Sequence, residues 1–382
     1  MLDVLVSGAS VAGPTVAWWL QRFGFRPVLV ERMNGPARGG HAIDVRGAAI
    51  TVLDAMGLTA QVRAAAMRMK GVSVVDDDGR EVWRSEDMTI SGGRFDNPDI
   101  EILRDRLARL MAGALPPDVP ILYGDSVAAL DEAPEGIDVR LASGRQQRFD
   151  LVIGADGLRS GIRQLHFGED REFLRSFDVA LAPFSAPNTL GLADWQISYK
   201  GRAGGYMVYT TPENDQLRVC FHVRGAGDGD LGDRAAQMAR IREQSGNLLW
   251  ETPRFLAAME AAPDFYLGLV AQVRMAGWTK GRVALVGDAG YCPSPYSGQG
   301  ATLAIVGGYL LASELARSPH DHRAAFARYE ARLKPFVDAN QAIADLTRDP
   351  RFERDPDYYR EVVEPALDKA KFAVELDGLA SV

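Results

Sequence analysis

The stretch Gly8-Ala9-Ser10-Val11-Ala12-Gly13 follows a short apolar run, Leu2 to Val6, and opens an apolar helix predicted over residues 14–23. A second apolar run, Pro27 to Val30, comes next. Gly8 allows a tight turn after a strand, and Gly13 lets the helix pack closely against that strand. The order strand, turn, helix, strand therefore predicts an α/β fold that begins with a parallel sheet.

This turn also predicts a nucleotide site. The start of a helix offers free N–H groups and a positive dipole end to a pyrophosphate. Ser10 replaces the usual middle glycine, and it is small enough for a phosphate to approach. Glu31, at the end of the second strand, can accept hydrogen bonds from ribose hydroxyls. The alternative is an ordinary βα turn followed by a surface glutamate, and the turn alone does not separate FAD from NAD.

Two later motifs favour a flavin. Asp150 to Ser160 ends a buried strand at Gly154-Ala155-Asp156-Gly157, and Arg282 to Ala289 ends another at Gly287-Asp288. The second is followed by Pro295 and by Ser297-Gly298-Gln299-Gly300-Ala301, which opens a long helix. An aspartate at a strand's carboxyl end can hold a ribityl hydroxyl, and the glycines leave room for a flat ring. The helix start can stabilise negative charge on a reduced flavin.

The region 178–270 has a different sequence pattern, with strand-like segments of alternating apolar and polar residues that predict a second, antiparallel sheet. Leu217, Val219, Phe221 and Val223 share one face of a strand, which we expect to be buried, whereas Arg218, Cys220 and His222 share a wetter face. Further elements are predicted by apolar spacing. The helices are 47–56, 100–114, 298–316, 322–346 and 358–374, and the strands are 72–75, 81–83, 121–123, 137–141, 149–153, 206–210, 217–223 and 283–286.

Composition narrows the function classes. A formal net charge of −8 argues against nucleic-acid and anionic-membrane partners, which call for clustered Lys and Arg. The two cysteines, Cys220 and Cys292, lack metal-ligand spacing and predict no disulfide framework, and no metal site is expected. The apolar run after Met1 is too short for a signal peptide, and no stretch approaches a membrane span. We therefore expect a cytoplasmic protein.

The three motifs, in this order, resemble those of the class A flavoprotein monooxygenases, which include para-hydroxybenzoate hydroxylase and the tetracycline-modifying hydroxylases. The version Ala9-Ser10-Val11-Ala12-Gly13-Pro14, together with Asp44-Val45-Arg46-Gly47, is most similar to the tetracycline-hydroxylase branch. The resemblance implies a Rossmann-type FAD-binding domain (1–71, 98–177 and 271–346) with an interleaved antiparallel substrate domain (72–97 and 178–270). Residues 347–382 would form a C-terminal helical segment.

The resemblance also implies a set of FAD-binding residues. These are Gly8, Ser10 and Gly13 at the pyrophosphate, Glu31 at the ribose, Arg32 at the adenine, Arg46 and Arg104 at the flavin and phosphates, Asp156 at a motif shared with the nicotinamide, Asp288 at the ribityl or pyrophosphate region, and Pro295, Gly298, Gly300 and Ala301 at the ring.

Several of these residues have simpler interpretations. Arg46 and Arg104 could be surface arginines, and Asp156 could cap the helix that follows it. His41 is expected in a loop, and His222 is expected to be structural. Thr302 stands where many relatives of this kind carry an asparagine near the flavin.

The implied reaction uses NADPH or NADH to reduce FAD, and the reduced flavin captures O2 as a C4a-hydroperoxide that hydroxylates a planar aromatic or polyketide-like molecule. Met207, Tyr209, Phe221 and Pro295 are the candidate substrate-lining residues, although the first three could be ordinary sheet core. Baeyer–Villiger oxygenation, double-bond reduction and a non-catalytic flavin-binding role stay open, as do a monomer and a homodimer. A disulfide reductase would need a redox-active cysteine pair, and a flavin halogenase a Trp-x-Trp-x-Ile-Pro signature, and the sequence contains neither.

Overall fold

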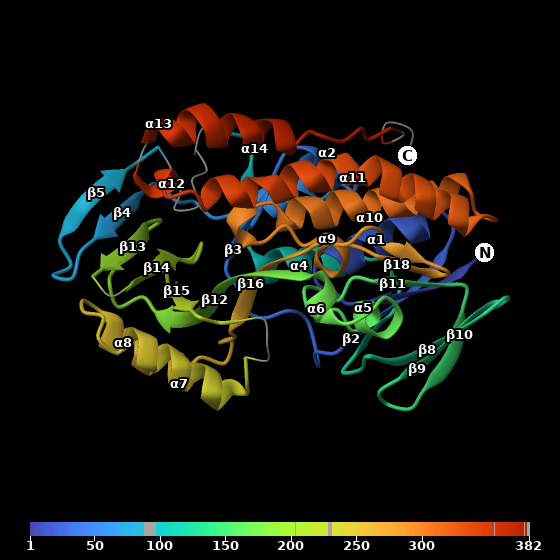
Figure 1. The fold of residues 1–382 in the computed structure, drawn as a ribbon, viewed down its shortest axis with the longest axis horizontal. Helices are drawn as coiled ribbons and strands as arrows, with labels where there is room; N and C mark the ends of the chain where they lie inside the picture. Colours follow the sequence, from blue (N-terminus) through green and yellow to red (C-terminus); the bar gives the residue numbers. More distant parts are fainter. Residues whose placement is uncertain (88–96, 203, 228–230, 355, 378, 380–382) are drawn as a thin grey trace.

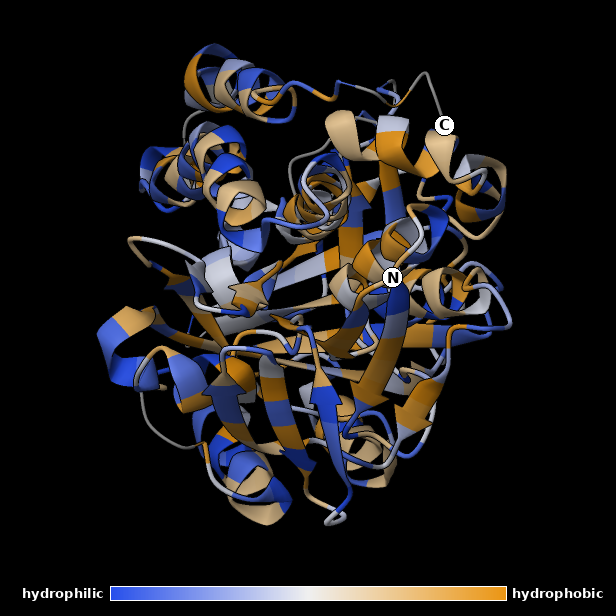
Figure 2. Ribbon diagram, turned by 90° about the vertical axis from the view of Figure 1, so that its right-hand side faces the viewer, coloured by the Kyte–Doolittle hydropathy of each residue, from blue (hydrophilic) through white to orange (hydrophobic). Residues whose placement is uncertain are grey.

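The computed structural model describes residues 1–87, 97–202, 204–227, 231–354, 356–377 and 379, and parts of the predicted segments 72–97, 178–270 and 347–382 lie outside these residues. Two large β-sheets dominate the structure, with helices packed against both (Figure 1). Strands in the middle of the molecule are mainly hydrophobic, whereas the outer helices mix hydrophobic and hydrophilic residues (Figure 2). The predicted α/β fold class is confirmed.

The first large sheet has six strands and contains the predicted βαβ unit. Its strands, in spatial order, are β17 (Thr279–Lys280), β18 (Val283–Leu285), β11 (Leu151–Gly154), β1 (Asp3–Ser7), β2 (Arg26–Glu31) and β7 (Ile121–Tyr123). All neighbouring pairs except β17 with β18 are parallel. Because parallel strands end at one edge of the sheet, the motifs that follow β1, β2, β11 and β18 meet there.

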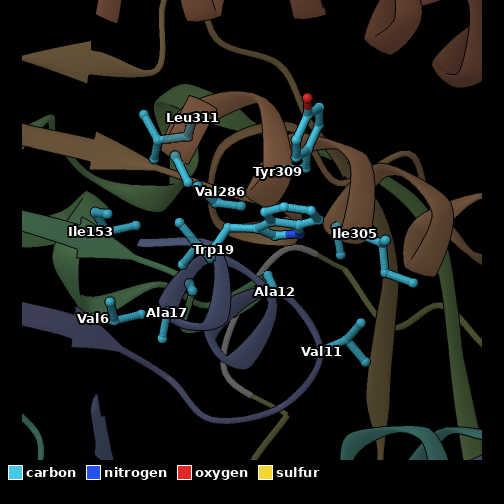
Figure 3. Close-up of a cluster of buried hydrophobic side chains, with 14 of the residues drawn as sticks. Val6, Val11, Ala12, Ala17, Trp19, Ile153, Val286, Ile305, Tyr309 and Leu311 are labelled. Carbon is cyan, nitrogen blue, oxygen red and sulfur yellow. The ribbon is translucent and has the colours of Figure 1, made fainter. Parts of the chain in front are cut away.

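Helix α1 (Ala12–Arg22) is held against this sheet by a long helix from much later in the chain, α10 (Gly300–Arg317). Trp19 is fully buried and meets the ring of Tyr309 edge-on, with ring centroids 4.9 Å apart (Figure 3). Val6 and Ile153, on the strands below, complete this core. Helix α11 (His322–Thr347) lies beside α10 (Figure 1) and agrees with the helix predicted over 322–346.

The second large sheet has seven strands. In spatial order they are β16 (Gly268–Val273), β12 (Leu174–Pro187), β15 (Gln216–Arg224), β14 (Gly204–Thr210), β13 (Gln196–Gly201), β4 (Val72–Val75) and β5 (Glu81–Ser85). Neighbours are antiparallel except β4 and β13, which are parallel. Helices α7 (Arg234–Ser245) and α8 (Thr252–Ala261) cover one face (Figure 1). The predicted antiparallel sheet thus takes two strands from the first hundred residues.

Both faces of β15 are buried over most of its length, so the expectation of one wetter face is wrong for Arg218 and Cys220, which are 6% and 1% exposed. Arg218 is held by Asp264 at 2.8 Å, and of the three residues expected on the wetter face only His222 is exposed. Alternation shows that two faces exist, but it does not show what covers each of them.

The helix predicted over 100–114 is also partly wrong. Residues Ile100–Leu103 form strand β6, which pairs with β3 (Ala42–Val45), and helix α4 begins only at Arg104 and ends at Gly113. The strand predicted over 149–153 is split at Asp150. Phe149 belongs to β10 (Gln146–Phe149), and the residues after Asp150 belong to β11. Strand β10 forms a three-stranded sheet with β9 (Gly136–Leu141) and β8 (Val127–Ala133).

The C-terminal segment is not one helix over 358–374. It contains α12 (Arg351–Arg354), α13 (Pro356–Tyr358), a π-helical turn η2 (Tyr359–Val363) and α14 (Glu364–Ala370). Pro365 has no N–H for the regular helical ladder, which explains an irregular turn just before it. The other helices are α2 (Ala48–Ala55), α3 (Thr59–Ala64), α5 (Gly161–His166), α6 (Asp170–Phe173), α9 (Asp288–Tyr291) and η1 (Pro295–Ser297). No helix in the described ranges is both long and apolar enough to cross a membrane.

Candidate active site

The turn after β1 leaves no room for side chains. Gly8 has a φ of 106°, and a Cβ there would overlap the Ala155 carbonyl oxygen and lie 2.8 Å from the Ala155 carbonyl carbon. A Cβ at Gly13 would overlap the Gly8 carbonyl oxygen. Helix α1 starts with neither a side-chain cap nor an acidic residue in its first turn, so its free N–H groups are open to an anion.

A single cavity of about 2720 Å³ extends from this turn to the seven-stranded sheet. Every predicted site residue lines it except Gly13, which packs against Gly8, and Phe221. Pockets for one drug-sized ligand are typically ~300–1,000 Å³. The cavity therefore has room for a dinucleotide together with a second molecule.

Glu31 lies at the end of the cavity that borders the glycine turn. Its carboxylate accepts hydrogen bonds from the backbone N–H groups of Ala9 at 2.8 Å and Met33 at 2.9 Å. The side chain therefore connects the end of β2 to the glycine turn while it lines the cavity. Arg32 is exposed beside it.

Asp156 caps the next helix and also faces the cavity. Its carboxylate accepts hydrogen bonds from the Ser160 hydroxyl at 2.5 Å and from the Ile162 N–H at 3.1 Å, at the start of α5. Burial raises the pKa of Asp156 above its ordinary value. The capping interpretation is therefore present in the structure, and a cofactor role is compatible with it because the same residue lines the cavity.

Asp288 and the residues after it form the middle of the cavity. Asp288 is the first residue of α9, and burial raises its pKa. The chain then turns through Ser294, with a φ of 79°, and Gly298, with a φ of 63°, before α10 begins. Gln299 is fully buried, and neither atom of its amide has a hydrogen-bond partner among the described residues.

Arg46 and Arg104 differ in their surroundings. Arg46 is only 5% exposed, so it is not a surface arginine, and its Nη2 lies 2.8 Å from Asp44 Oδ2. Its backbone N–H donates to the Thr302 hydroxyl at 3.1 Å. Arg104 opens α4, and its exposed side chain lines the cavity. Burial, together with the charge of Arg104, lowers the pKa of the nearby His41 to about 4, so His41 is neutral at physiological pH.

The sheet contributes Met207 and Tyr209 to the cavity but not Phe221. In the β14–β15 pair, Met207 lies opposite Cys220, and both line the cavity. Phe221 is on the other face, where it packs against Tyr206 and Phe184 and is fully buried. Because side chains alternate along a strand, neighbours such as Cys220 and Phe221 necessarily point to opposite faces. The structure thus does not bring Phe221 to the cavity.

This difference predicts separate effects for two substitutions. Phe221→Leu should lower the free energy of unfolding by about 1–2 kcal/mol, because it leaves a gap in the core, and should leave KM unchanged. Met207→Phe should raise KM by narrowing the cavity, with a smaller effect on stability. Thermal unfolding measures the stability of each variant, and steady-state kinetics measure its KM. A shift in KM for Phe221→Leu without one for Met207→Phe would contradict the assignment of faces.

Several cavity residues were missed by the sequence analysis. Glu101 and Asp44 line the cavity from the β3–β6 pair, and Tyr359 and Val363 line it from the C-terminal segment. The pairing of residues 42–45 with 100–103 was hidden because the second stretch was interpreted as the start of a helix. No local pattern marked the C-terminal residues.

Comparison with known proteins agrees with this geometry. The family model described as an FAD binding domain matches residues 1–343. A flavin-dependent monooxygenase from an unknown prokaryotic organism is 36% identical, over 98% of this chain and 98% of its own length. The chain belongs to the class A FAD-dependent monooxygenases. A flavin-dependent monooxygenase of Legionella longbeachae is 39% identical to this monooxygenase, over 89% of the chain and 87% of its own length.

Two solved structures place this monooxygenase near the tetracycline-hydroxylase branch. The tetracycline destructase Tet(55) superimposes with a TM-score of 0.86 at 35% identity, covering 98% of this chain and 97% of its own. The tetracycline destructase Tet(51) gives a TM-score of 0.89 at 32% identity, covering 99% and 100%. The resemblance inferred from the three motifs is therefore confirmed, as is the assignment of FAD as the cofactor.

The residues present fit FAD. The turn at Gly8 is a cradle that any Cβ would fill, and the uncapped start of α1 supplies donors for a pyrophosphate. At the other end, Gly298 and Gly300 line the cavity, and neither has a side chain that would occupy the space of a flat ring. Gln299, between them, is fully buried and does not line the cavity.

Proposed function

We propose that this monooxygenase uses NAD(P)H and O2 to hydroxylate a planar aromatic or polyketide-like molecule. The observation that carries the proposal is the single cavity that runs from the glycine turn, past Asp288 and Gly298, to Met207 and Tyr209 on the seven-stranded sheet. A flavin ring bound at Gly298–Ala301 would face a substrate held against that sheet. The assigned roles of the site residues and the division into domains are part of this proposal.

The protein's own part is binding, orientation and exclusion of water. The start of α1 would hold the pyrophosphate, Glu31 the ribose and Asp288 the ribityl chain. Met207, Tyr209 and Pro295 would hold the substrate flat against the ring, and the C-terminal residues Tyr359 and Val363 would close the cavity from above the sheet. FAD, once bound and reduced, supplies the activation of O2 from which one oxygen atom is transferred.

Tetracycline is the first probe because it is named for the two structural neighbours with 35% and 32% identity. The similarity extends beyond the tetracycline destructases, since monooxygenase CTB7 of Cercospora beticola is 36% identical over 89% of this chain. We pair tetracycline with polycyclic phenols because the proposed substrate is an aromatic or polyketide-like molecule. All of these molecules carry a hydroxylated aromatic ring within a fused ring system, which suits a cavity between a ring site and a sheet.

The test is the consumption of NADPH and NADH by the FAD-loaded enzyme, with and without each probe. We expect a probe to accelerate NAD(P)H oxidation and to gain one oxygen atom. An FAD-loaded protein that modifies none of the panel would contradict the proposal, and one that also fails to oxidise NAD(P)H, with or without a probe, would favour a non-catalytic flavin-binding role. Product structure distinguishes hydroxylation from Baeyer–Villiger insertion, and a gain of two hydrogens would indicate double-bond reduction.

A further inference from the structure

Two carboxyl groups face each other across the β3–β6 pair. Asp44 and Glu101 are direct partners in the antiparallel register, so their side chains share one face, and both line the cavity. Like charges in directly opposite positions destabilise a sheet. Two acidic groups at this spacing therefore favour a state in which only one of them is ionised.

The surroundings decide which carboxyl keeps its charge. Asp44 Oδ2 lies 2.8 Å from Arg46 Nη2, and the two side chains are 12% and 6% exposed. Glu101 meets a neutral group instead, the amide of Gln196, whose Nε2 lies 3.3 and 3.5 Å from its two carboxyl oxygens. Asp44 thus has a cationic partner and Glu101 has a neutral one, so the geometry favours placing the proton on Glu101.

The groups that face Glu101 from neighbouring elements agree with this assignment. They are Asp44 and Arg46 from the β3 side, Gln196 from β13 and Tyr209 from β14. Burial, and after it the charge of Asp44, raises the pKa of Glu101 to about 8, although Arg46 and Gln196 act in the opposite direction. At neutral pH Glu101 is therefore a hydrogen-bond donor.

The position of Glu101 in the cavity indicates which group this donor can reach. A Cβ at Gly298 would lie 3.5 Å from Asp44 Oδ2 and 3.7 Å from Arg46 Nη2, so the ion pair borders the predicted ring site. Gln196 belongs to the seven-stranded sheet. Glu101 thus lies between the ring site and the sheet. Arg46 Nε, on a side chain 6% exposed, has no hydrogen-bond partner among the described residues, but it forms an ion pair with Asp99 Oδ2 at 4.0 Å, which holds Arg46 in place beside Asp44.

We propose that Glu101 is a specificity-determining residue whose carboxylic acid donates a hydrogen bond to a carbonyl or phenolic oxygen of the substrate. The inference rests on the proposed function, and it names the substrate class as molecules with an oxygen acceptor on the ring system. A protonated acid selects such an oxygen because the donor is left unpaired when the oxygen is missing.

The first experiment needs no substrate. The infrared difference spectrum of the FAD-loaded wild type against Glu101→Gln should show the C=O stretch of a carboxylic acid at pH 7, and this band should disappear as the pH rises through about 8. Gln has the same shape and stays neutral, so it is the matched variant. The absence of the band at pH 7 would overturn the proposal.

The second experiment measures binding of tetracycline and the polycyclic phenols through the change in flavin absorbance. For a probe that binds wild type, affinity should fall as the pH rises through about 8, whereas Glu101→Gln should bind with no such step. Glu101→Leu should bind about tenfold more weakly at pH 7, because it lacks the donor.

The outcomes separate this inference from the proposed function. Unchanged binding by Glu101→Leu would overturn the role of Glu101 while wild-type binding and turnover leave the function intact. If no probe binds the FAD-loaded wild type, the proposed function fails, and the inference that rests on it fails too.

Discussion

Gly8→Ala should produce a protein that is purified without FAD and unfolds at a lower temperature. The new Cβ would overlap the carbonyl oxygen of Ala155, and the φ of 106° is unfavourable for any residue with a side chain. Both opposing atoms belong to the backbone, so no side chain can move away. Strain and overlap together should cost on the order of 3 kcal/mol and displace the turn that is to bind the pyrophosphate.

Gly24→Ala is the matched control. Gly24 also has a positive φ, 86°, but a Cβ there would meet nothing within 4 Å. The Gly24→Ala variant should therefore lose only about 1 kcal/mol in its free energy of unfolding and should keep its FAD. FAD content per chain and thermal unfolding measure both variants. A full complement of FAD in Gly8→Ala would show that the turn is not the pyrophosphate site.

Glu314→Gln should reduce the free energy of unfolding by about 2 kcal/mol, because it removes the charge of a fully buried carboxylate that binds three arginines, and solvent reaches these arginines, whose side chains are 20–45% exposed. Glu314 is fully buried in α10 and binds Arg317 at 3.0 Å, Arg328 at 2.7 Å and Arg332 at 2.5 Å. Two of these arginines lie on α11, so the carboxylate connects the two helices that cover the nucleotide-binding sheet. Denaturant unfolding of the FAD-free protein measures the effect directly.

Asp338→Asn, on α11, is the comparison for an exposed ion pair. Asp338 lies 3.2 Å from Lys334, both side chains are more than half exposed, and its loss should cost less than about 0.5 kcal/mol. Equal effects of the two substitutions would contradict the importance of burial.

The Glu314 cluster also predicts a dependence on pH. Burial opposes ionisation of Glu314, but hydrogen bonds from Arg328 and Arg332 outweigh it and hold the pKa below the ordinary 4.5. A lowered carboxyl pKa stabilises the folded state fully above pH 4.5, and this contribution is lost as the pH falls through the lowered value. The difference in stability between wild type and Glu314→Gln should therefore shrink below pH 4.5.

The parts of the fold that could be predicted are those that depend on local sequence. Gly8 and Gly13 mark a strand-turn-helix because glycine alone fits that backbone, and the carboxyl ends of parallel strands bring Glu31, Asp156 and Asp288 together. A resemblance built on these motifs was therefore sufficient to identify the family. Long helices such as 322–346 were also predicted correctly, since their apolar spacing repeats many times.

The parts that could not be predicted depend on distant partners. Ile100–Leu103 becomes a strand because Ala42–Val45 is available to pair with it, and nothing within either stretch shows this. The same pairing sets Asp44 against Glu101, so the carboxyl pair could not be seen either. Phe221 was placed at the cavity because alternation separates two faces of β15 without showing that α7 and α8 cover one of them.

The order of strands in the two large sheets has a consequence for how the chain is made. The sheet that contains β1 can be completed only after β18, at residues 283–285, has been synthesised. Helix α1 is covered only after α10, at residues 300–317, has left the ribosome. Strands β4 and β5 can likewise join the seven-stranded sheet only after β13 has been synthesised. We therefore expect the nascent chain to expose apolar surface until α10 has been synthesised, which makes aggregation during synthesis a risk for this topology.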